Sequence, residues 1–340
     1  MNIMLADFLQ LVAGLTILVT GGELMVRGAS ALARSLGVST LVIGLTVVAF
    51  GTSAPELAVN IGAAIDDAGS LAFGNIFGSN MANIGLIIGL VAVLQPIPIQ
   101  TILIRRELPM LILATSAALV MAFDVDLGGA RDAYMRTDGL ILLLFFFVFL
   151  YYTVGDLIRR RTEDADEAAD VGPPLLEIPE DQGLSPKSNV GRDTALTVVG
   201  LVGLVGGAKL TVMGATSLAH AFAVPEVVIG LTMVSIGTSL PELAAAISCL
   251  RHGKADMAVG SVVGSNIFNT LLVAGATATV RPMAIPASGH IDLLAMCGMS
   301  LLFALTAFTQ GNKIIRTEGV LLMVTYAVYV VWRTYTYALG

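Results

Sequence analysis

The chain repeats one stretch of its own sequence 186 residues later, and each copy carries a glutamate within an apolar run. Residues 44–58 read GLTVVAFGTSAPELA and residues 230–244 read GLTMVSIGTSLPELA, with eleven of these fifteen positions identical. The same offset holds without a gap for a downstream Gly-Ser-Asn block, at residues 78–83 and 264–269. The sequence therefore predicts two related halves, each of which places a similar polar segment in apolar surroundings.

The composition indicates a membrane protein. Of the 340 residues 56% are hydrophobic and only 13% are charged, unlike a soluble domain of this length. Apolar runs of the roughly 17–25 residues that a membrane helix needs recur throughout. We therefore expect an all-α membrane protein with ten transmembrane helices. The expected spans are 7–26, 38–63, 71–94, 104–123, 138–156, 193–216, 225–249, 255–279, 288–309 and 317–338.

The basic residues predict how the chain is oriented, because lysine and arginine are enriched in cytoplasmic loops. If the N-terminus lies outside, thirteen of the eighteen Lys and Arg residues fall on the cytoplasmic side. Both termini are then outside, as ten spans require. We expect a multi-pass protein of the cell's inner membrane.

The two halves are expected to lie upside down relative to each other. Residues 1–156 and 193–340 each supply five spans, an odd number, which gives the inverted-topology repeat found in many secondary transporters. Between them, residues 157–192 are acidic and contain a Pro-Pro pair, which favours a flexible cytoplasmic linker. A regulatory Ca²⁺-binding role for this linker is the less favoured alternative, because EF-hand spacing is absent.

The duplicated Gly-Thr-Ser-x-Pro-Glu segment supplies oxygen atoms at a helix irregularity. Pro55 lacks a backbone N–H and is expected to break or kink its helix, which frees carbonyl groups near the bilayer centre. Thr52 and Ser53 supply hydroxyl oxygens and Glu56 a carboxylate, the ligands that hard cations prefer. The second copy repeats these residues as Thr238, Ser239, Pro241 and Glu242.

The downstream block adds a polar helix face to each half. Ser79 and Asn83 are four residues apart, hence on one face, as are Ser265 and Asn269. These residues could simply join helices by hydrogen bonds, and the accompanying glycines could serve only close packing. Their position beside a duplicated Pro-Glu segment favours a role in ion binding.

The glutamates need a counter-charge, because an unpaired charge at the membrane centre is costly. The only basic residue expected inside a span is Lys209, whose position in the repeat matches that of Glu23. We expect this pair of positions near span ends, at interfacial depth. A bound cation is therefore the natural partner of Glu56 and Glu242, although protonated, purely structural carboxylates are the alternative.

These motifs resemble those of the Na⁺/Ca²⁺ exchangers of the cation/Ca²⁺ antiporter superfamily, whose two repeats carry G-T-S-x-P-E and G-S-N-x-x-N/D signatures. The resemblance implies a core of the second, third, seventh and eighth spans, across which the first and sixth slide. It also implies exchange of about three Na⁺ for one Ca²⁺. The implied ligands are Thr52, Ser53, Glu56, Ser79, Asn83, Thr238, Ser239, Glu242, Ser265 and Asn269, with backbone carbonyls near Ala49 and Ser235.

Two departures from relatives refine this expectation. Some relatives, including K⁺-dependent exchangers, carry Asp at the position of Asn269, so we predict that K⁺ is not transported. The G-N-x-x-E repeat of H⁺-coupled relatives is absent, which favours Na⁺ as the driving ion. A Ca²⁺/H⁺ antiporter of the same superfamily is the alternative.

Other classes of protein are less well supported. No His, Lys or Asp stands beside Ser53 or Ser239 to act as a base, so we expect no enzyme. A channel needs a continuous pore, whereas inverted repeats with interrupted helices favour alternating access. We expect no cofactor, with Ca²⁺, Na⁺ and the lipid bilayer as partners, and a fold that permits a functional monomer.

Overall fold

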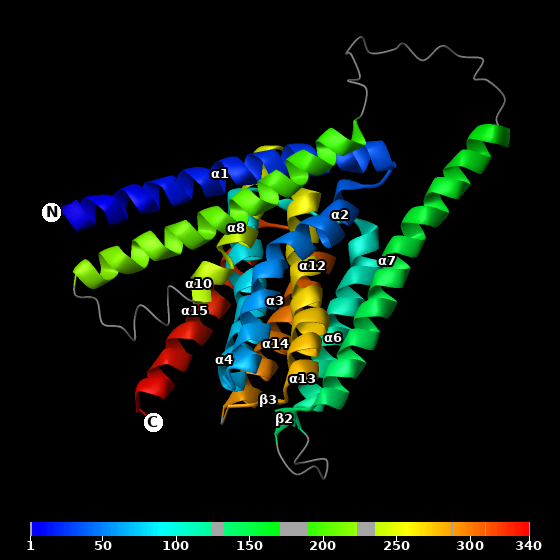
Figure 1. Ribbon diagram of the computed structural model, residues 1–340. Helices are drawn as coiled ribbons and strands as arrows, with labels where there is room; N and C mark the ends of the chain where they lie inside the picture. The colour runs from blue at the N-terminus through cyan, green and yellow to red at the C-terminus, as the bar shows by residue number, and fades with distance from the viewer. Residues whose placement is uncertain are drawn as a thin grey trace.

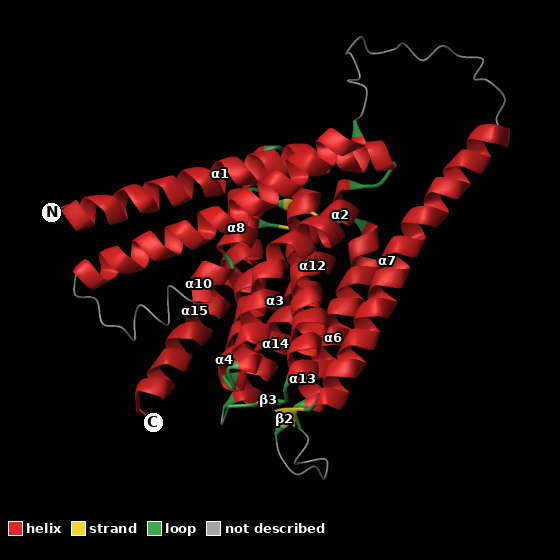
Figure 2. Cartoon of the chain, in the orientation of Figure 1, coloured by secondary structure: helices red, strands yellow, loops and turns green. Residues whose placement is uncertain are grey.

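The structure is a computed structural model that describes residues 2–123, 132–170, 189–222, 235–286, 288–309 and 311–339. Most of these residues are helical (Figures 1 and 2). In chain order the α-helices are α1 (Asn2–Leu36), α2 (Thr40–Ile43), α3 (Ala49–Ile65), α4 (Gly69–Ala82), α5 (Gly89–Leu94), α6 (Leu108–Met121), α7 (Arg136–Asp170), α8 (Val190–Ala221), α10 (Ser235–Thr238), α11 (Leu240–Arg251), α12 (Ala255–Phe268), α13 (Ala274–Val280), α14 (Gly289–Phe308) and α15 (Arg316–Leu339).

Short π-helical turns interrupt several of these helices. A π-helical turn holds one extra residue per turn and commonly marks a functional site. Two of these turns are separated by the 186-residue offset of the sequence repeat, and each begins at an asparagine of the Gly-Ser-Asn block. The turns are η1 (Gly44–Val48), η2 (Asn83–Ile88), η3 (Leu103–Glu107) and η5 (Asn269–Val273).

Seven helical segments among the described residues are long and apolar enough to cross a membrane. Together with the exposed apolar side chains, they make this a multi-pass membrane protein. Three further predicted spans also contain helices: α6 with η3, α10 with α11, and α15. The seven segments are Leu5–Leu36, Thr40–Ile65, Gly69–Leu94, Arg136–Thr153, Val190–Leu218, Ala255–Val280 and Gly289–Phe308.

Helices α1 and α8 lie side by side and antiparallel across one end of the helix bundle (Figure 1). Glycines seven residues apart permit this approach, since a Cβ on Gly14, Gly21 or Gly28 would lie 2.5, 2.7 or 2.5 Å from a backbone nitrogen of α8. A Cβ added to each repeat-equivalent glycine of α8 would lie 2.3, 2.5 or 2.7 Å from a backbone nitrogen of α1. These equivalents are Gly200, Gly207 and Gly214.

Two short antiparallel strand pairs join loops that are distant in sequence. Strand β1 (Ile97–Pro98) pairs with β4 (Lys313–Ile314), and β2 (Ala133–Tyr134) pairs with β3 (Met283–Ala284). Strands β1 and β3 are separated by the repeat offset, so they are equivalent strands of the two halves. Each belongs to a different pair.

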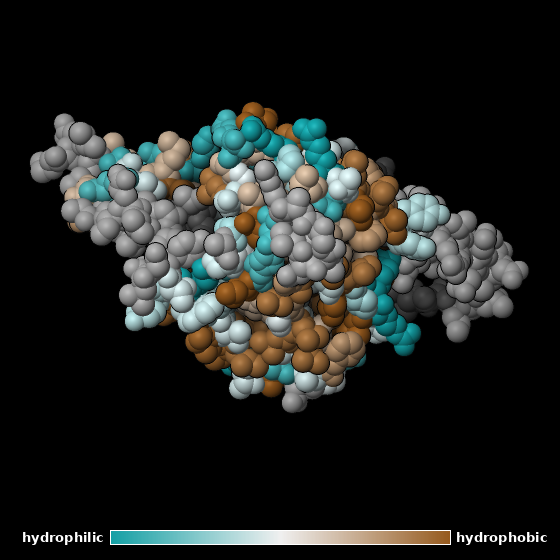
Figure 3. Space-filling model, turned by 90° about the horizontal axis from the view of Figure 1, so that it is seen from below, coloured by the Kyte–Doolittle hydropathy of each residue, from teal (hydrophilic) through white to brown (hydrophobic). Residues whose placement is uncertain are grey.

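Helices α4 and α12, which carry the Gly-Ser-Asn blocks, lie in the interior. The helices around them carry the exposed apolar surface. In the most apolar 18 residues of the Ala255–Val280 segment 94% are buried, whereas the corresponding share in Leu5–Leu36 and Val190–Leu218 is 33%. Large apolar side chains are exposed along α1, α7, α8, α14 and α15. Viewed from below, hydrophobic residues cover much of the visible centre of the molecule (Figure 3). A lipid environment accounts for this surface, since soluble monomers rarely expose apolar patches of such extent.

Several boundaries differ from those expected. Helix α7 continues beyond residue 156 to Asp170, so the first part of the predicted linker is helical. The alanines and glutamates there favour a helix, which a reading based on acidic composition overlooked. Residues 171–188 of the linker, and 225–234 of the seventh predicted span, lie outside the described residues.

Glu23 and Lys209 do not lie near the ends of their helices, where they were expected, while their interfacial depth stays a prediction. Helices α1 and α8 extend well past the predicted spans, so both residues lie far from the helix ends. Glu23 is paired with Arg251 at 3.4 Å, and Lys209 is exposed. The predicted spans were shorter than α1 and α8. The charged residues therefore lie within these helices and not near their ends.

The two proline segments have different structures. Helix α3 continues through Pro55, with the π-helical turn η1 just before it. The second copy is interrupted at Ser239, between α10 and α11, and Pro241 lies in the first turn of α11, where its missing N–H costs nothing. A break is therefore present in the second copy but not in the first.

Candidate functional site

Helices from both halves bring the two glutamates together in the interior. Glu56 lies in α3 and Glu242 in α11, and each is only 1% exposed. Their carboxylates are close enough for the two charges to interact. Helices α4 and α12 pack beside them and, with the turns η2 and η5 that follow, contribute the Ser/Asn faces. The duplicated segments, distant in sequence, thus form one polar region.

This region contains an unusual number of buried oxygen atoms without a hydrogen-bond partner. Buried polar atoms are nearly always paired, so such a concentration needs an explanation. Within the described residues, eight oxygens of the predicted ligand set have no hydrogen-bond partner. They are Ser53 Oγ, both carboxylate oxygens of Glu56, Asn83 Oδ1, Ser239 Oγ, both carboxylate oxygens of Glu242, and Asn269 Oδ1.

Hydrogen bonds between halves hold other members of the predicted set in place. The hydroxyls of Thr52 and Ser265 are 3.3 Å apart, and Asn269 Nδ2 donates to Ser79 Oγ at 3.3 Å. In both pairs one residue comes from each half. The amide of Asn269 thereby turns its donor toward Ser79, while its Oδ1 has no partner in the described chain.

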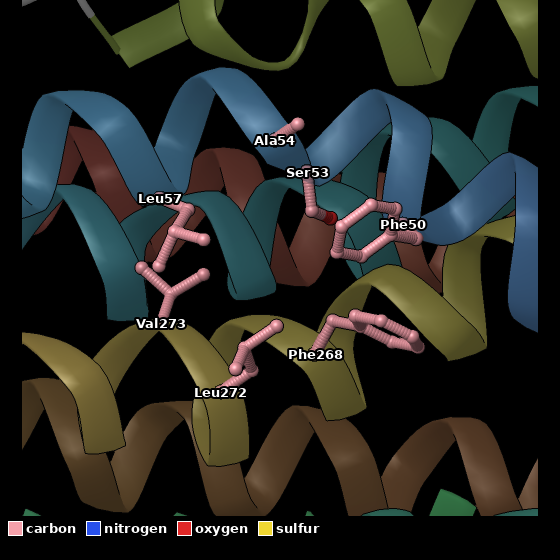
Figure 4. Close-up of a pocket in the computed structure, with 7 residues that line it drawn as sticks. All are labelled: Phe50, Ser53, Ala54, Leu57, Phe268, Leu272 and Val273. Atoms are coloured by element: carbon pink, nitrogen blue, oxygen red, sulfur yellow. The ribbon is translucent and has the colours of Figure 1, made fainter.

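The predicted backbone carbonyls are those of Ala49 and Ser235, and Ser53 has apolar surroundings on one side. Thr52 Oγ1 donates to the carbonyl of Ala49 at 3.3 Å, so that carbonyl lies beside the site. Ser235 begins α10, and its side chain lies outside the described residues. Ser53 borders an apolar crevice between α3 and α12, where Phe50 and Phe268 flank it (Figure 4).

Sequence reasoning missed an amide network that joins the two halves. Asn80 Nδ2 donates to Thr270 Oγ1 at 2.8 Å, and Asn266 Nδ2 donates to the carbonyl of Asn80 at 3.2 Å. Asn266 Oδ1 also accepts a hydrogen bond from Asn83 Nδ2 at 3.0 Å. Asn80 and Asn266 are repeat equivalents, so the duplicated Gly-Ser-Asn block already contained the signal.

Asn60 is a second residue that the motifs did not indicate. It follows Glu56 by one helical turn, is fully buried, and donates from Nδ2 to the Glu56 carbonyl at 2.7 Å. Its Oδ1 has no partner among the described residues. The repeat equivalent is Ala246, which is why comparing the two halves gives no signal.

The site offers hard oxygen ligands, among them the carboxyl groups of Glu56 and Glu242. In the part of the chain that the structure describes, neither Glu56 nor Glu242 forms an ion pair, and no three His, Cys, Asp or Glu side chains cluster. Neutral hydroxyl and amide oxygens make up the rest of the set. Such a mixture suits a reversibly bound Na⁺ or Ca²⁺ better than a tightly held transition metal.

Comparison with known proteins agrees with this chemistry. The family model described as sodium/calcium exchanger protein matches residues 7–155 and 193–335, which is most of the chain. The chain belongs to the sodium/calcium exchanger family. Members of this family are transporters rather than enzymes.

Full-length relatives and a solved structure extend the match. The chain is 36% identical over 331 residues to the inner membrane protein YrbG of Escherichia coli K12, covering 97% of this chain and 96% of that protein. It is 33% identical over 346 residues to the sodium/calcium exchanger MaX1 of Methanosarcina acetivorans, covering 96% and 97%. The sodium-calcium exchanger NCX_Mj superposes with a TM-score of 0.80 at 30% identity, covering 97% of this chain and 99% of that structure.

Proposed function

We propose that this exchanger-family protein is a Na⁺/Ca²⁺ antiporter whose cations bind the buried oxygens around Glu56 and Glu242. The observation that carries the proposal is the set of eight buried, unpartnered oxygens, four of them on carboxylates without an ion pair in the described chain. A cation would supply the missing partner for all of them. Either one Ca²⁺ or several Na⁺ neutralises two carboxylates.

Exchange follows from competition for the same two carboxylates. With Glu56 and Glu242 charged, the empty site carries a charge near −2, which opposes occlusion within the membrane. Only a loaded carrier then changes sides, so transport of one ion is coupled to return of the other. A ratio of three Na⁺ to one Ca²⁺ makes the cycle electrogenic.

The proposed architecture is ten transmembrane helices in two inverted five-helix repeats, with alternating access to one central site. It is supported by the antiparallel α1–α8 pair and by the equivalent turns η2 and η5. The strands β1 and β3, in two separate pairs, support it further. We place both termini outside and the linker in the cytoplasm, on the basis of the Lys and Arg distribution.

The experiment is ⁴⁵Ca²⁺ uptake by purified protein in liposomes under imposed gradients. An outward Na⁺ gradient is expected to drive uptake, and K⁺ in place of Na⁺ is not. Uptake driven by a pH gradient alone, with no response to Na⁺, would instead identify a Ca²⁺/H⁺ antiporter. A membrane potential should change the rate if the exchange is electrogenic.

A further inference from the structure

Thr52 and Thr238 are repeat equivalents, but their hydroxyls have non-equivalent partners. Thr52 Oγ1 lies 3.3 Å from Ser265 Oγ, whereas Thr238 Oγ1 donates to Asn75 Oδ1 at 3.3 Å. The repeat equivalent of Ser265 is Ser79, four residues after Asn75 in α4. The repeat symmetry would pair Thr238 with Ser79. Its actual partner, Asn75, lies about 6 Å from Ser79 along the axis of α4.

The residue equivalent to Asn75 in the second half is Ser261 of α12. Ser261 is fully buried, and its Oγ has no hydrogen-bond partner in the described chain. It lies on the face of α12 that packs against η1, because a Cβ on Gly44 would come within 3.1 Å of its backbone nitrogen. Ser261 thus stands one helical turn from Ser265, beside the segment that leads to Thr52.

The segments α2 and η1 pack closely against α12. A Cβ on Gly44 would lie 2.5 Å from the Met257 carbonyl, and one on Gly260 would lie 2.6 Å from the Leu41 carbonyl. At the beginning of α2 the Thr40 hydroxyl donates to the Asp256 carboxylate. In the orientation proposed above, this close packing lies on the cytoplasmic side of the site.

We propose that Asn75 and Ser261 are positioning residues that hold the two threonines in alternate states of the transport cycle. In the state described, Thr52 pairs with Ser265 and Thr238 with Asn75. In the state open to the cytoplasm, the repeats exchange roles. Thr52 then pairs with Ser261 and Thr238 with Ser79.

This inference rests on the proposed alternating access, and it explains two otherwise separate facts. The buried Ser261 hydroxyl lacks a partner because its partner, Thr52, is engaged with Ser265 in this state. Asn75 accepts from Thr238 because α10 is one helical turn nearer the outer end of α4. Each hydrogen bond exists in only one state, so each biases the equilibrium between the two.

Removing either residue should therefore shift the equilibrium in opposite directions. Ser261→Ala weakens the state open to the cytoplasm, and Asn75→Ala weakens the state described here. A ligand's apparent affinity falls with the fraction of protein able to bind it. One hydrogen bond corresponds to a change of about fivefold in such an equilibrium.

The test is Na⁺-driven ⁴⁵Ca²⁺ transport in liposomes of uniform protein orientation, with the KM for Ca²⁺ measured at each face. Ser261→Ala is expected to raise the KM at the cytoplasmic face by about fivefold and to leave or lower it at the outer face. Asn75→Ala is expected to do the reverse. Asn75→Ser, which supplies the hydroxyl used at position 261, should return the outer KM toward that of the unmodified protein.

Two results would overturn the inference. Shifts of the same direction at the same face in both variants would indicate general damage, and unchanged values in both would show that neither bond biases the cycle. If one variant does not fold, the other still decides, because its predicted shift is confined to one face. Absence of exchange in the unmodified protein would overturn the proposed function itself, a separately recognisable outcome.

Discussion

Glu56 and Glu242 are two buried carboxyl groups, and burying their charge would cost free energy. Each is 1% exposed and has no hydrogen-bond partner for its carboxylate oxygens among the described residues. A charged residue at a membrane helix centre costs roughly 2.5–3.5 kcal/mol on insertion scales. Since two charged carboxylates would also repel each other, the proposed bound cation would remove both penalties.

Replacing either glutamate with glutamine should abolish exchange. Glu56→Gln and Glu242→Gln keep the volume of the side chain but remove one of the two charges that balance Ca²⁺. Na⁺-driven ⁴⁵Ca²⁺ uptake is expected to fall to the level of protein-free liposomes. Glu23→Gln, the same substitution at a partly exposed residue of α1, should retain uptake. Near-normal uptake in both site variants would contradict the assigned role.

Asn269 is the residue at which a change of ion profile is expected. Its Nδ2 donates to Ser79 and its Oδ1 is unpartnered in the described chain, so Asn269→Asp adds a third negative charge beside the site. The variant is expected to change the apparent affinity for cations and to make transport sensitive to K⁺. Uptake measured with and without K⁺ checks this, and an unchanged ion profile would count against the interpretation of Asn269.

At the scale of elements, glycines allow the backbones of α1 and α8 to approach each other closely. Backbone atoms of one helix occupy the space where a Cβ would stand on the other. Close backbone contact of this kind is how small residues associate helices in membranes. Since the most extensive contact of α1 is with α8, these glycines determine how closely the two helices approach.

Gly200→Ala should destabilise the protein. The added Cβ would lie 2.3 Å from the Met25 backbone nitrogen, and overpacking of this kind costs about 1–3 kcal/mol. Gly206→Ala in the same helix is the matched control, because no atom of a described neighbouring helix lies within 4 Å of its added Cβ. Thermal unfolding followed by size-exclusion chromatography should show a lower midpoint for Gly200→Ala alone. Equal midpoints would contradict the tight packing of α1 and α8.

The elements show where reasoning from sequence succeeded and where it stopped. Apolar runs located the helices well because burial in lipid requires them, whatever the tertiary contacts. They did not reveal that α3 continues through Pro55 while the second copy breaks at Ser239. Similar motifs predict similar local structure, so the repeat gave no sign that the two copies differ at the proline.

For the whole molecule, the duplication of the sequence was the strongest evidence for the site. It could not indicate site residues that occur in only one half. Residues present in both halves, such as Glu56 and Glu242, could be predicted to meet. Asn60 could not, because its equivalent is Ala246. Likewise, Asn75 and Ser261 are chemically different, and their equivalence acquires meaning only from the hydrogen bonds of Thr238 and Thr52.

The central claim is that Ca²⁺ and Na⁺ compete for one site at Glu56 and Glu242. Equilibrium binding of ⁴⁵Ca²⁺ to the purified protein, titrated with Na⁺, tests it most directly. We expect saturable Ca²⁺ binding that Na⁺ displaces competitively and that Glu56→Gln abolishes. Ca²⁺ binding that is indifferent to Na⁺, or that survives in Glu56→Gln, would contradict the account.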